Sequence, residues 1–446
     1  MNTPIFDFVA RYAASETARF HMPGHKGKCF LGCEPLDITE IDGADVLYSA
    51  DGIIDESEQN ATALFDTAHS YYSAEGSSLC IKAMLGLVAQ SRKREGRPLI
   101  LAARNVHKAF VYACALLDLD VEWLLSKDEE HLCSCTVTAA GVEAFLQCRT
   151  PTAVYLTSPD YLGQVADIAS ISRVCRQYNV PLLVDNAHGA YLQFLTPSQH
   201  PIALGATLCC DSAHKTLPVL TGGAYLHISK DADPAYLQSA RGMLSMFAST
   251  SPSYLILQSL DLCNRYLASN YRGRLEHCIQ VLNGIKKTLS ERGFVIDATE
   301  PLKLVINTQA SGLYGNALAH LLHDRRVEVE FADRDRLVLM VTPETDASDY
   351  EKLLSALSDV EPKAARSNEG GTVTVYDVTR VCTIREAIFA PHEVIPTAEA
   401  LGRICASPTV SCPPAVPVVV SGERITEETL RLLLYYRVDH VEVVVE

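Results

Sequence analysis

A carboxylate and a lysine each follow a short apolar run within one stretch of the chain, and this pairing constrains the fold more than any other feature. The apolar run at 180–184 ends in Asp185, and the run at 206–210 leads to Lys215. Short apolar runs of this kind form buried parallel strands. Open α/β sheets bind ligands outside the carboxyl ends of such strands, so we expect Asp185 and Lys215 to lie at one site.

A lysine and an aspartate at neighbouring strand ends suit the cofactor pyridoxal phosphate. The lysine amine forms a Schiff base with the cofactor aldehyde, and the carboxylate keeps the pyridine nitrogen protonated so that the ring can accept electrons. We therefore predict that Lys215 attaches the cofactor and that Asp185 binds its ring nitrogen. An ordinary surface lysine is the alternative, and the residues that flank Lys215 argue against it.

These flanking residues resemble the Orn/Lys/Arg decarboxylase family of fold-type I pyridoxal phosphate enzymes. The resemblance lies in Asp185-x-x-His188-Gly189 and in SAHKT at 212–216, with further similar segments FHMPGHKG at 20–27 and STSPSY at 249–254. It implies an α/β fold, with an aspartate aminotransferase-like large domain built on a mixed, mostly parallel sheet. A small α+β domain and a C-terminal α+β unit are expected beside it.

The resemblance also predicts the domain organisation. We expect an N-terminal arm and a segment leading into the active site at 1–50, the cofactor-binding large domain at 51–270, the small domain at 271–365 and the C-terminal decarboxylase-type domain at 372–446. Longer family members carry an N-terminal regulatory domain ahead of the FHMPGHKG motif. Because the motif begins here at Phe20, that domain is expected to be absent.

Hydrophobic patterning predicts the secondary structure. Strands are expected at 99–103, 153–157, 304–308, 327–331 and 337–341. Helices are expected at 1–18, 56–68, 79–89, 109–117, 171–178, 275–292 and 318–324.

The segment around Gly76 predicts the phosphate site of the cofactor. Gly76, Ser77 and Ser78 precede an apolar helical run, and a helix N-terminus offers backbone N–H groups and a favourable dipole to a phosphate. Capping of the helix is the alternative role for these residues. The family usually has Asn where this chain has Glu75, so Glu75 is expected to point elsewhere or to contact a cationic substrate.

The resemblance assigns further cofactor and proton-transfer roles. His107 would stack on the pyridine ring, and Ser212 and His214 would contact the cofactor beside Lys215. Lys215, His188 or His214 would return a proton to the substrate carbon. Thr250 and Ser251 resemble residues that reach the cofactor phosphate of the neighbouring subunit. This predicts a homodimer, or a larger homo-oligomer, with shared active sites.

Three carboxylates are candidates to bind the distal cation of a basic substrate. Asp160 stands in a TSPDYLG segment that resembles TSPTYYG in the family, and a solvated loop aspartate is the alternative. Glu423 and Glu386 lie in the C-terminal domain, where structural roles are equally plausible. Further departures from the family pattern are Cys412, Ala415 and Ser421.

Charge and composition exclude several other classes of protein. The net charge is −16 and no run rich in Lys or Arg occurs, so neither nucleic acid nor an anionic membrane surface is an expected partner. No signal peptide or membrane-spanning stretch is evident. The fifteen cysteines show no paired CxxC spacing, so we expect reduced thiols in a cytoplasmic protein without a metal site.

The expected activity is decarboxylation of lysine, ornithine or arginine, and it rests on the resemblance. The same cofactor also supports transamination, elimination and aldol cleavage. A fold-type I aminotransferase or lyase acting on another amino acid is therefore one alternative. A catalytically weak or regulatory pyridoxal phosphate-binding protein is another, suggested by Glu75, Asp160, Cys412 and Ala415.

Overall fold

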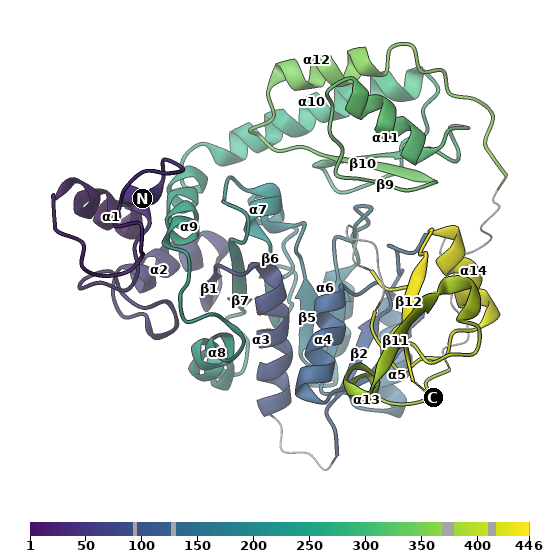
Figure 1. Cartoon of the computed structure of the whole chain (residues 1–446), viewed down its shortest axis with the longest axis horizontal. Coiled ribbons are helices and arrows are strands. Elements are labelled where there is room, and N and C mark those ends of the chain that lie inside the picture. The colour runs from purple at the N-terminus through teal and green to yellow at the C-terminus, as the bar shows by residue number, and fades with distance from the viewer. Residues whose placement is uncertain (92–95, 126–130, 368–378, 409–415, 446) are drawn as a thin grey trace. The chain divides into compact units, whose positions relative to one another are not determined.

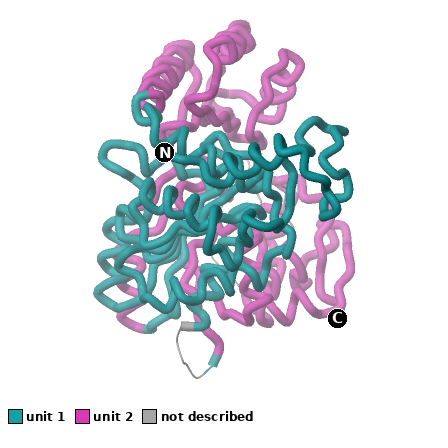
Figure 2. Tube along the Cα trace, turned by 90° about the vertical axis from the view of Figure 1, so that its left-hand side faces the viewer, with its two compact units in different colours: residues 1–96, 149–156, 168–273 teal, residues 97–148, 157–167, 274–446 magenta. Residues whose placement is uncertain are grey.

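The computed structural model describes residues 1–91, 96–125, 131–367, 379–408 and 416–445. The chain divides into two compact units (Figure 2). The first contains residues 1–96, 149–156 and 168–273, and the second contains residues 97–148, 157–167 and 274–446. None of the described helices is long and apolar enough to cross a membrane. The domain boundaries expected at 51, 271 and 372 stay a prediction.

Seven strands form a sheet in the order β1-β7-β6-β5-β4-β2-β3. Strand β7 is antiparallel to both β1 and β6, whereas β5 runs parallel to β6 and β2 runs parallel to β3. The sheet is therefore mixed but mostly parallel, which confirms the predicted fold class. Its strands are β1 (His69–Ser73), β2 (Leu99–Ala103), β3 (Asp120–Leu124), β4 (Ala153–Thr157), β5 (Leu182–Asp185), β6 (Leu208–Asp211) and β7 (Ala224–Ile228).

Helices accompany the strands of each unit (Figure 1). Those of the first unit are α1 (Pro4–Ala14), α2 (Ile53–Phe65), α3 (Gly76–Ser91), α6 (Ile168–Gln177), α7 (Ala213–Thr216), α8 (Pro234–Phe247) and α9 (Tyr254–Leu267), with the 3-10 turns η1 (Glu34–Leu36), η2 (Leu47–Ser49) and η3 (Ala190–Phe194). The second unit has α4 (Lys108–Leu117), α5 (Ala139–Cys148), α11 (Gly315–Asp324), α12 (Ala347–Ala356), α13 (Ile384–Phe389), η4 (Thr397–Glu399) and α14 (Glu427–Tyr435). Helix α10 (Tyr271–Glu291) begins in the first unit and continues into the second.

Two smaller sheets belong to the second unit. One has the order β8 (Lys303–Asn307), β10 (Arg336–Met340) and β9 (Phe331–Ala332), and the other pairs β11 (His392–Pro396) with β12 (His440–Val444). The strand predicted at 327–331 is wrong for residues 327–330, which form no strand. Its alternating valines and glutamates imitate a strand, but the segment first turns at Arg326, whose φ is +62°.

Burial explains which strands the sequence predicted. Every residue of β2, β5 and β6 is buried, as their apolar runs indicate. Strand β1 reads HSYYS and was not predicted, yet it is buried throughout. Its polar groups have internal partners: the backbone N–H of Tyr72 donates to Glu58 Oε1 at 2.9 Å, and Ser70 Oγ lies 2.8 Å from His227 Nδ1.

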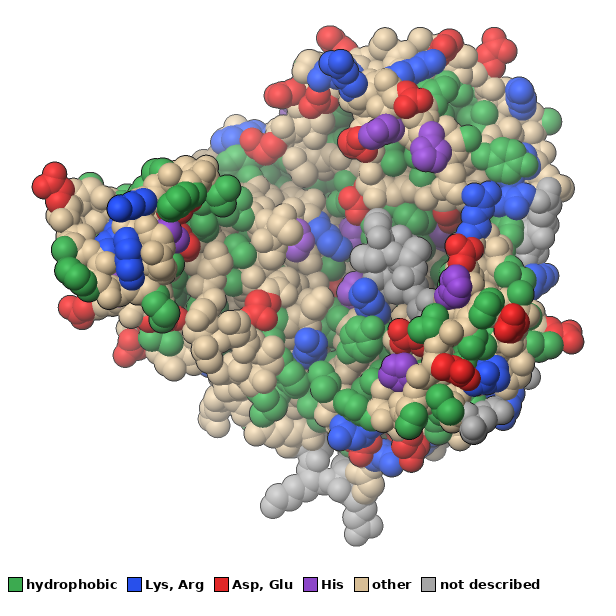
Figure 3. Space-filling model, viewed as in Figure 1, with side chains coloured by type: hydrophobic (Ala, Val, Ile, Leu, Met, Phe, Trp, Pro, Cys, Tyr) green, Lys and Arg blue, Asp and Glu red, His purple; other side chains and the backbone are tan. Residues whose placement is uncertain are grey.

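Charged side chains of both signs are mixed on the face of the protein seen in Figure 3. The mixture agrees with a composition of 54 acidic and 38 basic residues that contains no long run of one sign.

Candidate active site

The two strands that carry the predicted catalytic residues are direct neighbours in the first unit. Strand β5 ends at Asp185 and pairs in parallel with β6, so that Asp185 lies opposite Cys210. Helix α7 starts two residues after β6 ends and contains Lys215. The sheet therefore brings Asp185 and Lys215 to the same carboxyl-terminal edge, as the sequence predicts.

The Lys215 amine contacts an imidazole. Lys215 Nζ lies 3.0 Å from His188 Nε2, and His188 is 4 % exposed. The turn after β5 sets this position, because the backbone N–H of Gly189 donates to Asn186 O at 2.8 Å. Gly189 also leaves room for this turn, since a Cβ there would lie 2.0 Å from Asn186 Oδ1. The amine and the imidazole can thus share one proton.

Asp185 is almost fully enclosed, with 2 % of its surface exposed. Burial raises the pKa of its carboxyl group, and the charge of Lys215 works in the opposite direction. The backbone N–H of Ala187 donates to Oδ1 at 3.2 Å, and the Tyr155 hydroxyl approaches Oδ2 at 3.4 Å. A cationic partner at this carboxylate would offset the cost of burying its charge.

Asp211 links the two strand ends, although no sequence motif singles it out. Asn186, the residue after Asp185, donates its side-chain N–H to Asp211 Oδ1 at 2.7 Å. The Nε2 atoms of His200 and His227 each lie 3.1 Å from Asp211 Oδ2, and all three side chains are fully buried. The signal was present in the sequence, since Asp211 ends a strand just as Asp185 does.

The predicted phosphate site is the N-terminus of α3. Gly76 has φ +72°, and its N–H donates to Gly222 O at 2.7 Å. Ser212 Oγ donates to Ser77 Oγ at 2.8 Å, which connects this helix start to the residue preceding α7. Ser78 lies in the same first turn of α3. The structure thus brings Gly76, Ser77 and Ser212 together in one unit.

Glu75 does not add an unpaired carboxylate to this helix start. Its Oε1 accepts the backbone N–H of Ser249 at 2.6 Å. The backbone N–H of Ser251 in turn donates to Ser249 Oγ at 3.1 Å, and Thr250 and Ser251 are exposed. Glu75 therefore points toward the segment that carries the two residues predicted to serve a neighbouring subunit. That intersubunit role stays a prediction.

The two other predicted histidines have defined hydrogen bonds. His107 is the N-cap of α4, and its Nδ1 accepts the backbone N–H of Ala109 at 3.1 Å. Its stacking role stays a prediction. His214 donates from Nδ1 to Gly223 O at 3.0 Å, and burial lowers the pKa of this histidine. The backbone contact fixes the ring of His214 directly beside Lys215 in the chain.

Asp160 lies in the second unit and is not the solvated loop residue of the alternative interpretation. It is 3 % exposed, and its Oδ1 accepts the backbone N–H of Gln164 at 2.8 Å. The buried Lys303 ammonium donates to Asp160 O at 3.0 Å. Burial raises the pKa of Asp160 to about 6. The alternative is wrong because the loop folds back over this carboxylate.

The two C-terminal glutamates have structural partners. Glu423 Oε2 accepts Arg104 Nη2 at 2.8 Å and the backbone N–H of Val420 at 2.7 Å. Glu386 completes the capping box of α13 with Thr383. Both carboxylates thus already have protein donors, while a substrate role for Glu423 stays untested. The departures at Cys412 and Ala415 lie outside the described residues.

The donor groups of the first unit fit pyridoxal phosphate. They comprise the Lys215 amine for the aldehyde, the buried Asp185 carboxylate for the ring nitrogen, and hydroxyl and backbone donors at the start of α3 for the phosphate. A Cβ added at Gly76 would meet nothing within 4 Å, so the start of α3 is open rather than filled by neighbouring side chains.

Two described clusters have the residue types of a metal site: His200, Cys209 and Asp211, and Asp55, Glu58 and His69. In the first, the imidazoles already donate to Asp211. In the second, the Arg241 guanidinium donates to Asp55 at 2.9 Å and to Glu58 at 2.8 Å. We interpret both clusters as hydrogen-bond networks.

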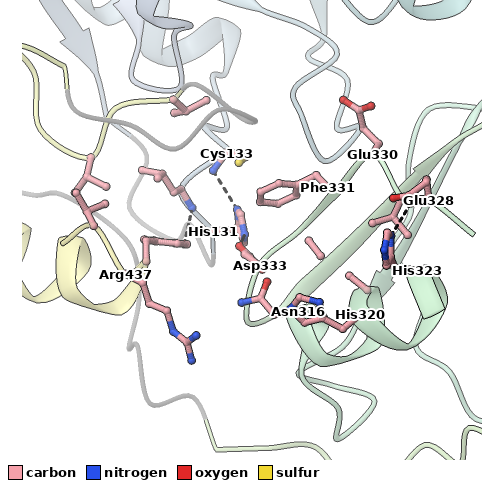
Figure 4. A pocket seen from close by; sticks show the side chains of 18 residues that line it. His131, Cys133, Asn316, His320, His323, Glu328, Glu330, Phe331, Asp333 and Arg437 are labelled. Carbon is pink, nitrogen blue, oxygen red and sulfur yellow. Dashed lines mark hydrogen bonds and ion pairs between the residues drawn. The ribbon is translucent and has the colours of Figure 1, made fainter. Parts of the chain in front are cut away.

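A cavity of about 550 Å3 lies in the second unit, and none of the predicted site residues lines it (Figure 4). His131 Nε2 lies 2.5 Å from Asp333 Oδ2 in its wall, and His323 Nδ1 lies 2.6 Å from Glu328 Oε1. Burial opposes protonation of His131, but Tyr436 and Asp333 raise its pKa well above the usual value. The buried pair ties the segment after β3 to the β9–β10 turn.

Two family models match the chain. The model described as Orn/Lys/Arg decarboxylase, major domain, matches residues 3–343, and the model described as Orn/Lys/Arg decarboxylase, C-terminal domain, matches residues 374–441. Together they match most of both units.

Curated relatives and solved structures agree with these models. An arginine decarboxylase of Bacillus subtilis is 28 % identical over 96 % of this chain and 92 % of its own length, and one of Bacillus anthracis is 26 % identical over 97 % and 92 %. The Francisella novicida lysine decarboxylase has a TM-score of 0.81 at 17 % identity, covering 99 % of this chain and 81 % of its own. The constitutive lysine decarboxylase of E. coli has a TM-score of 0.79 at 18 % identity, covering 100 % and 82 %.

Proposed function

The chain belongs to the Orn/Lys/Arg decarboxylase family, and we propose that it releases carbon dioxide from arginine and leaves agmatine. Family membership makes it a pyridoxal phosphate-dependent decarboxylase of a basic amino acid. Arginine is our choice because relatives that align with 96 % and 97 % of the chain are named arginine decarboxylases. The observation that carries the chemistry is the 3.0 Å contact between Lys215 and His188 beside the Asp185 strand end.

Residues of the first unit would hold the cofactor. Gly76, Ser77 and Ser78 would form its phosphate site: the N–H of Gly76 is bonded to Gly222 O, so this glycine would leave room for the phosphate, while Ser77 and Ser78 would donate to it at the positive end of the helix dipole. Asp185 would hold a proton on the ring nitrogen, and the cationic ring would compensate its buried charge. When bound, pyridoxal phosphate supplies a ring that accepts the electron pair left as the bond to the carboxylate breaks.

Lys215 and His188 would manage the proton that replaces the carboxylate. Lys215 Nζ can receive a proton from His188 Nε2 at 3.0 Å and deliver it to the substrate carbon. The 4 % exposure of His188 limits the access of water to this pair. Protonation of the substrate carbon, with the amino group leaving together with the product, would give an amine.

The test is a mass-spectrometric assay of pyridoxal phosphate-supplemented protein with arginine, lysine and ornithine, beside Lys215→Ala. We expect agmatine from arginine and no product from the variant. A diamine from lysine or ornithine would correct the substrate. A keto acid would support an aminotransferase, and no product from any of the three would support a weak cofactor-binding protein.

We further propose a homodimer with shared active sites. The FHMPGHKG motif and the segment after it expose large apolar side chains: Phe20 is 96 % exposed, Met22 68 %, Phe30 80 % and Leu31 89 %. Exposed apolar patches of this kind are typical of interaction surfaces. The exposed Thr250 and Ser251 would reach the partner's cofactor phosphate. The cytoplasmic location stays a prediction.

Mixing two inactive variants tests the shared site. Lys215→Ala lacks the attachment residue, and a Thr250→Ala/Ser251→Ala double variant lacks the groups assigned to the neighbouring site. Mixed dimers should recover up to about a quarter of wild-type activity, because one of the two sites is intact in half of them. Absence of recovery, with dimers seen by sedimentation, would show that each subunit completes its own site.

A further inference from the structure

The second unit contains a cavity of about 430 Å3 that the proposed chemistry does not use. One wall is strand β3, which stands last in the order of the seven-stranded sheet. The other walls come from residues 380–384 and 420–423 of the C-terminal region. This volume is within the usual range for small-molecule sites in proteins.

Backbone pairing holds the C-terminal wall in place. The N–H of Val381 donates to Gly422 O at 2.8 Å, and the N–H of Arg424 donates to Thr379 O at 3.0 Å. Gly422 has φ +87°, and a Cβ there would lie 2.5 Å from Cys382 O. Only glycine allows this close approach, which fixes Ser421 and Glu423 on either side of it.

Three acceptor atoms in the wall lack a hydrogen-bond partner among the described residues. They are Ser421 Oγ, Glu423 Oε1 and Asp120 Oδ1, the last of which forms an ion pair of 3.5 Å with Arg380 but no hydrogen bond. Ser421 is 1 % exposed and Glu423 is 4 % exposed, so water reaches them poorly. Buried polar atoms without partners are rare in native proteins because each costs free energy. Their presence around one cavity points to a ligand that donates hydrogen bonds.

The charges of the wall favour a cation. The lining residues include three carboxylates, those of Asp120, Glu122 and Glu423, and one guanidinium, that of Arg380, whose Nη1 lies 3.5 Å from Asp120 Oδ1. Glu423 is also paired with Arg104. Among the lining residues carboxylates therefore outnumber guanidinium groups, which favours a cationic over an anionic ligand.

The rest of the wall is apolar and aromatic. Val121 and Val420 are buried in it, and Trp123 completes it. Arg104 stacks on the Trp123 ring with its Cζ 4.8 Å from the ring centre. An alkyl chain fits such a surface, and only its charged end needs the three acceptors.

From this arrangement we infer that the cavity binds a small aliphatic amine or guanidine, with its cationic end at Asp120, Ser421 and Glu423. Agmatine, the product of the proposed reaction, belongs to this class, and that link alone rests on the proposed function. The site would then let the enzyme bind its product outside the Lys215 centre.

Trp123 allows a direct test, because it is the one tryptophan of the 446-residue chain. The cofactor-loaded protein is titrated with agmatine and with n-butylamine while tryptophan fluorescence is recorded, and n-butanol serves as the uncharged control. We expect a saturable change with both cations and none with the alcohol. This readout does not depend on turnover, so a failure to decarboxylate arginine would leave it intact.

Two mild variants locate the binding. Asp120→Asn and Ser421→Ala should each weaken binding of agmatine about tenfold, since each removes part of the acceptor set without leaving a buried charge unpaired. Asp118→Asn, which alters an exposed carboxylate paired with Arg97, should not change it. Lys215→Ala should retain the fluorescence change. No saturable change, a change that survives both variants, or a change lost in Lys215→Ala would overturn the inference.

Discussion

Lys215 Nζ lies 3.0 Å from His188 Nε2, so the amine predicted to attach the cofactor has an imidazole as its direct partner. This contact gives a proton donor to the nitrogen that would protonate the substrate carbon. General acid–base groups of this kind contribute about 100-fold or more to a rate.

His188→Phe should therefore lower kcat about 100-fold, with a much smaller change in KM. Steady-state measurement of agmatine formation checks this. His323→Phe, at an exposed histidine of α11, should keep wild-type kcat. An unchanged kcat in His188→Phe would assign proton delivery to Lys215 without help from His188.

Asp211 should matter for stability as much as for the site. It is fully buried, and it accepts hydrogen bonds from His200, His227 and Asn186. Breaking a buried charged network by removing one partner typically costs about 3 kcal/mol or more. We expect Asp211→Asn to lose about this much in urea unfolding at neutral pH, whereas Asp118→Asn should change stability by less than about 1 kcal/mol.

The same network predicts a dependence on pH. Burial alone would raise the pKa of Asp211, but His200 and His227 lower it below the usual range. A lowered pKa in the folded state stabilises the protein above the unfolded pKa, near 3.9, and this stabilisation is lost as pH falls through the folded value. Wild type should lose more stability than Asp211→Asn below about pH 4. Parallel losses in the two proteins would exclude Asp211 as the cause.

The sequence predicted the strands and residues whose role depends on local pattern. Asp185 and Lys215 stand at strand ends after apolar runs, and β5 and β6 pair there as expected. Strand β1 escaped prediction because its residues are polar, and it is buried only through partners such as Glu58 and His227.

The two carboxylates proposed to contact the substrate, Glu423 and Asp160, show what the sequence could not predict. The partner of Glu423 is Arg104, which lies 319 residues away in the chain. Only the folded chain reveals such a pair. Likewise, Asp160 is followed by an ordinary loop sequence, yet Lys303 donates to its backbone carbonyl from 143 residues away. An acidic residue in a family motif therefore indicates a position but not its partner.

Glu75 departs from the family pattern, and its contact with Ser249 predicts a structural role for it. Because its Oε1 accepts the Ser249 N–H at 2.6 Å, Glu75→Ala should release the segment that carries Thr250 and Ser251. We expect the variant to retain pyridoxal phosphate about threefold to tenfold less well, an effect that is small because Glu75 is exposed. The cofactor absorbance that remains after dialysis measures this. Glu75→Gln keeps the acceptor and should resemble wild type. Equal retention in Glu75→Ala would make the contact dispensable.

We expect Asp160 to lower the stability of the protein as pH rises through the mildly acidic range. Burial raises its pKa to about 6, although the Gln164 N–H and Lys303 lower it. Its unfolded pKa is near 3.9. Between these values the folded protein binds more protons than the unfolded chain, so the free energy of unfolding decreases as pH rises from about 4 to 6.

Asp160→Asn should remove this decrease. Asparagine keeps the Oδ1 acceptor for Gln164 but carries no charge, so above about pH 6 the variant should be more stable than wild type by up to about 3 kcal/mol. Urea unfolding at several pH values measures the difference, with Asp118→Asn as the exposed control. Parallel stability curves for the two proteins, together with a higher KM for arginine in Asp160→Asn, would contradict this prediction. They would instead indicate that the carboxylate contacts the substrate. A group that binds a cation only in the complex need not differ in pKa between the free folded and unfolded chains.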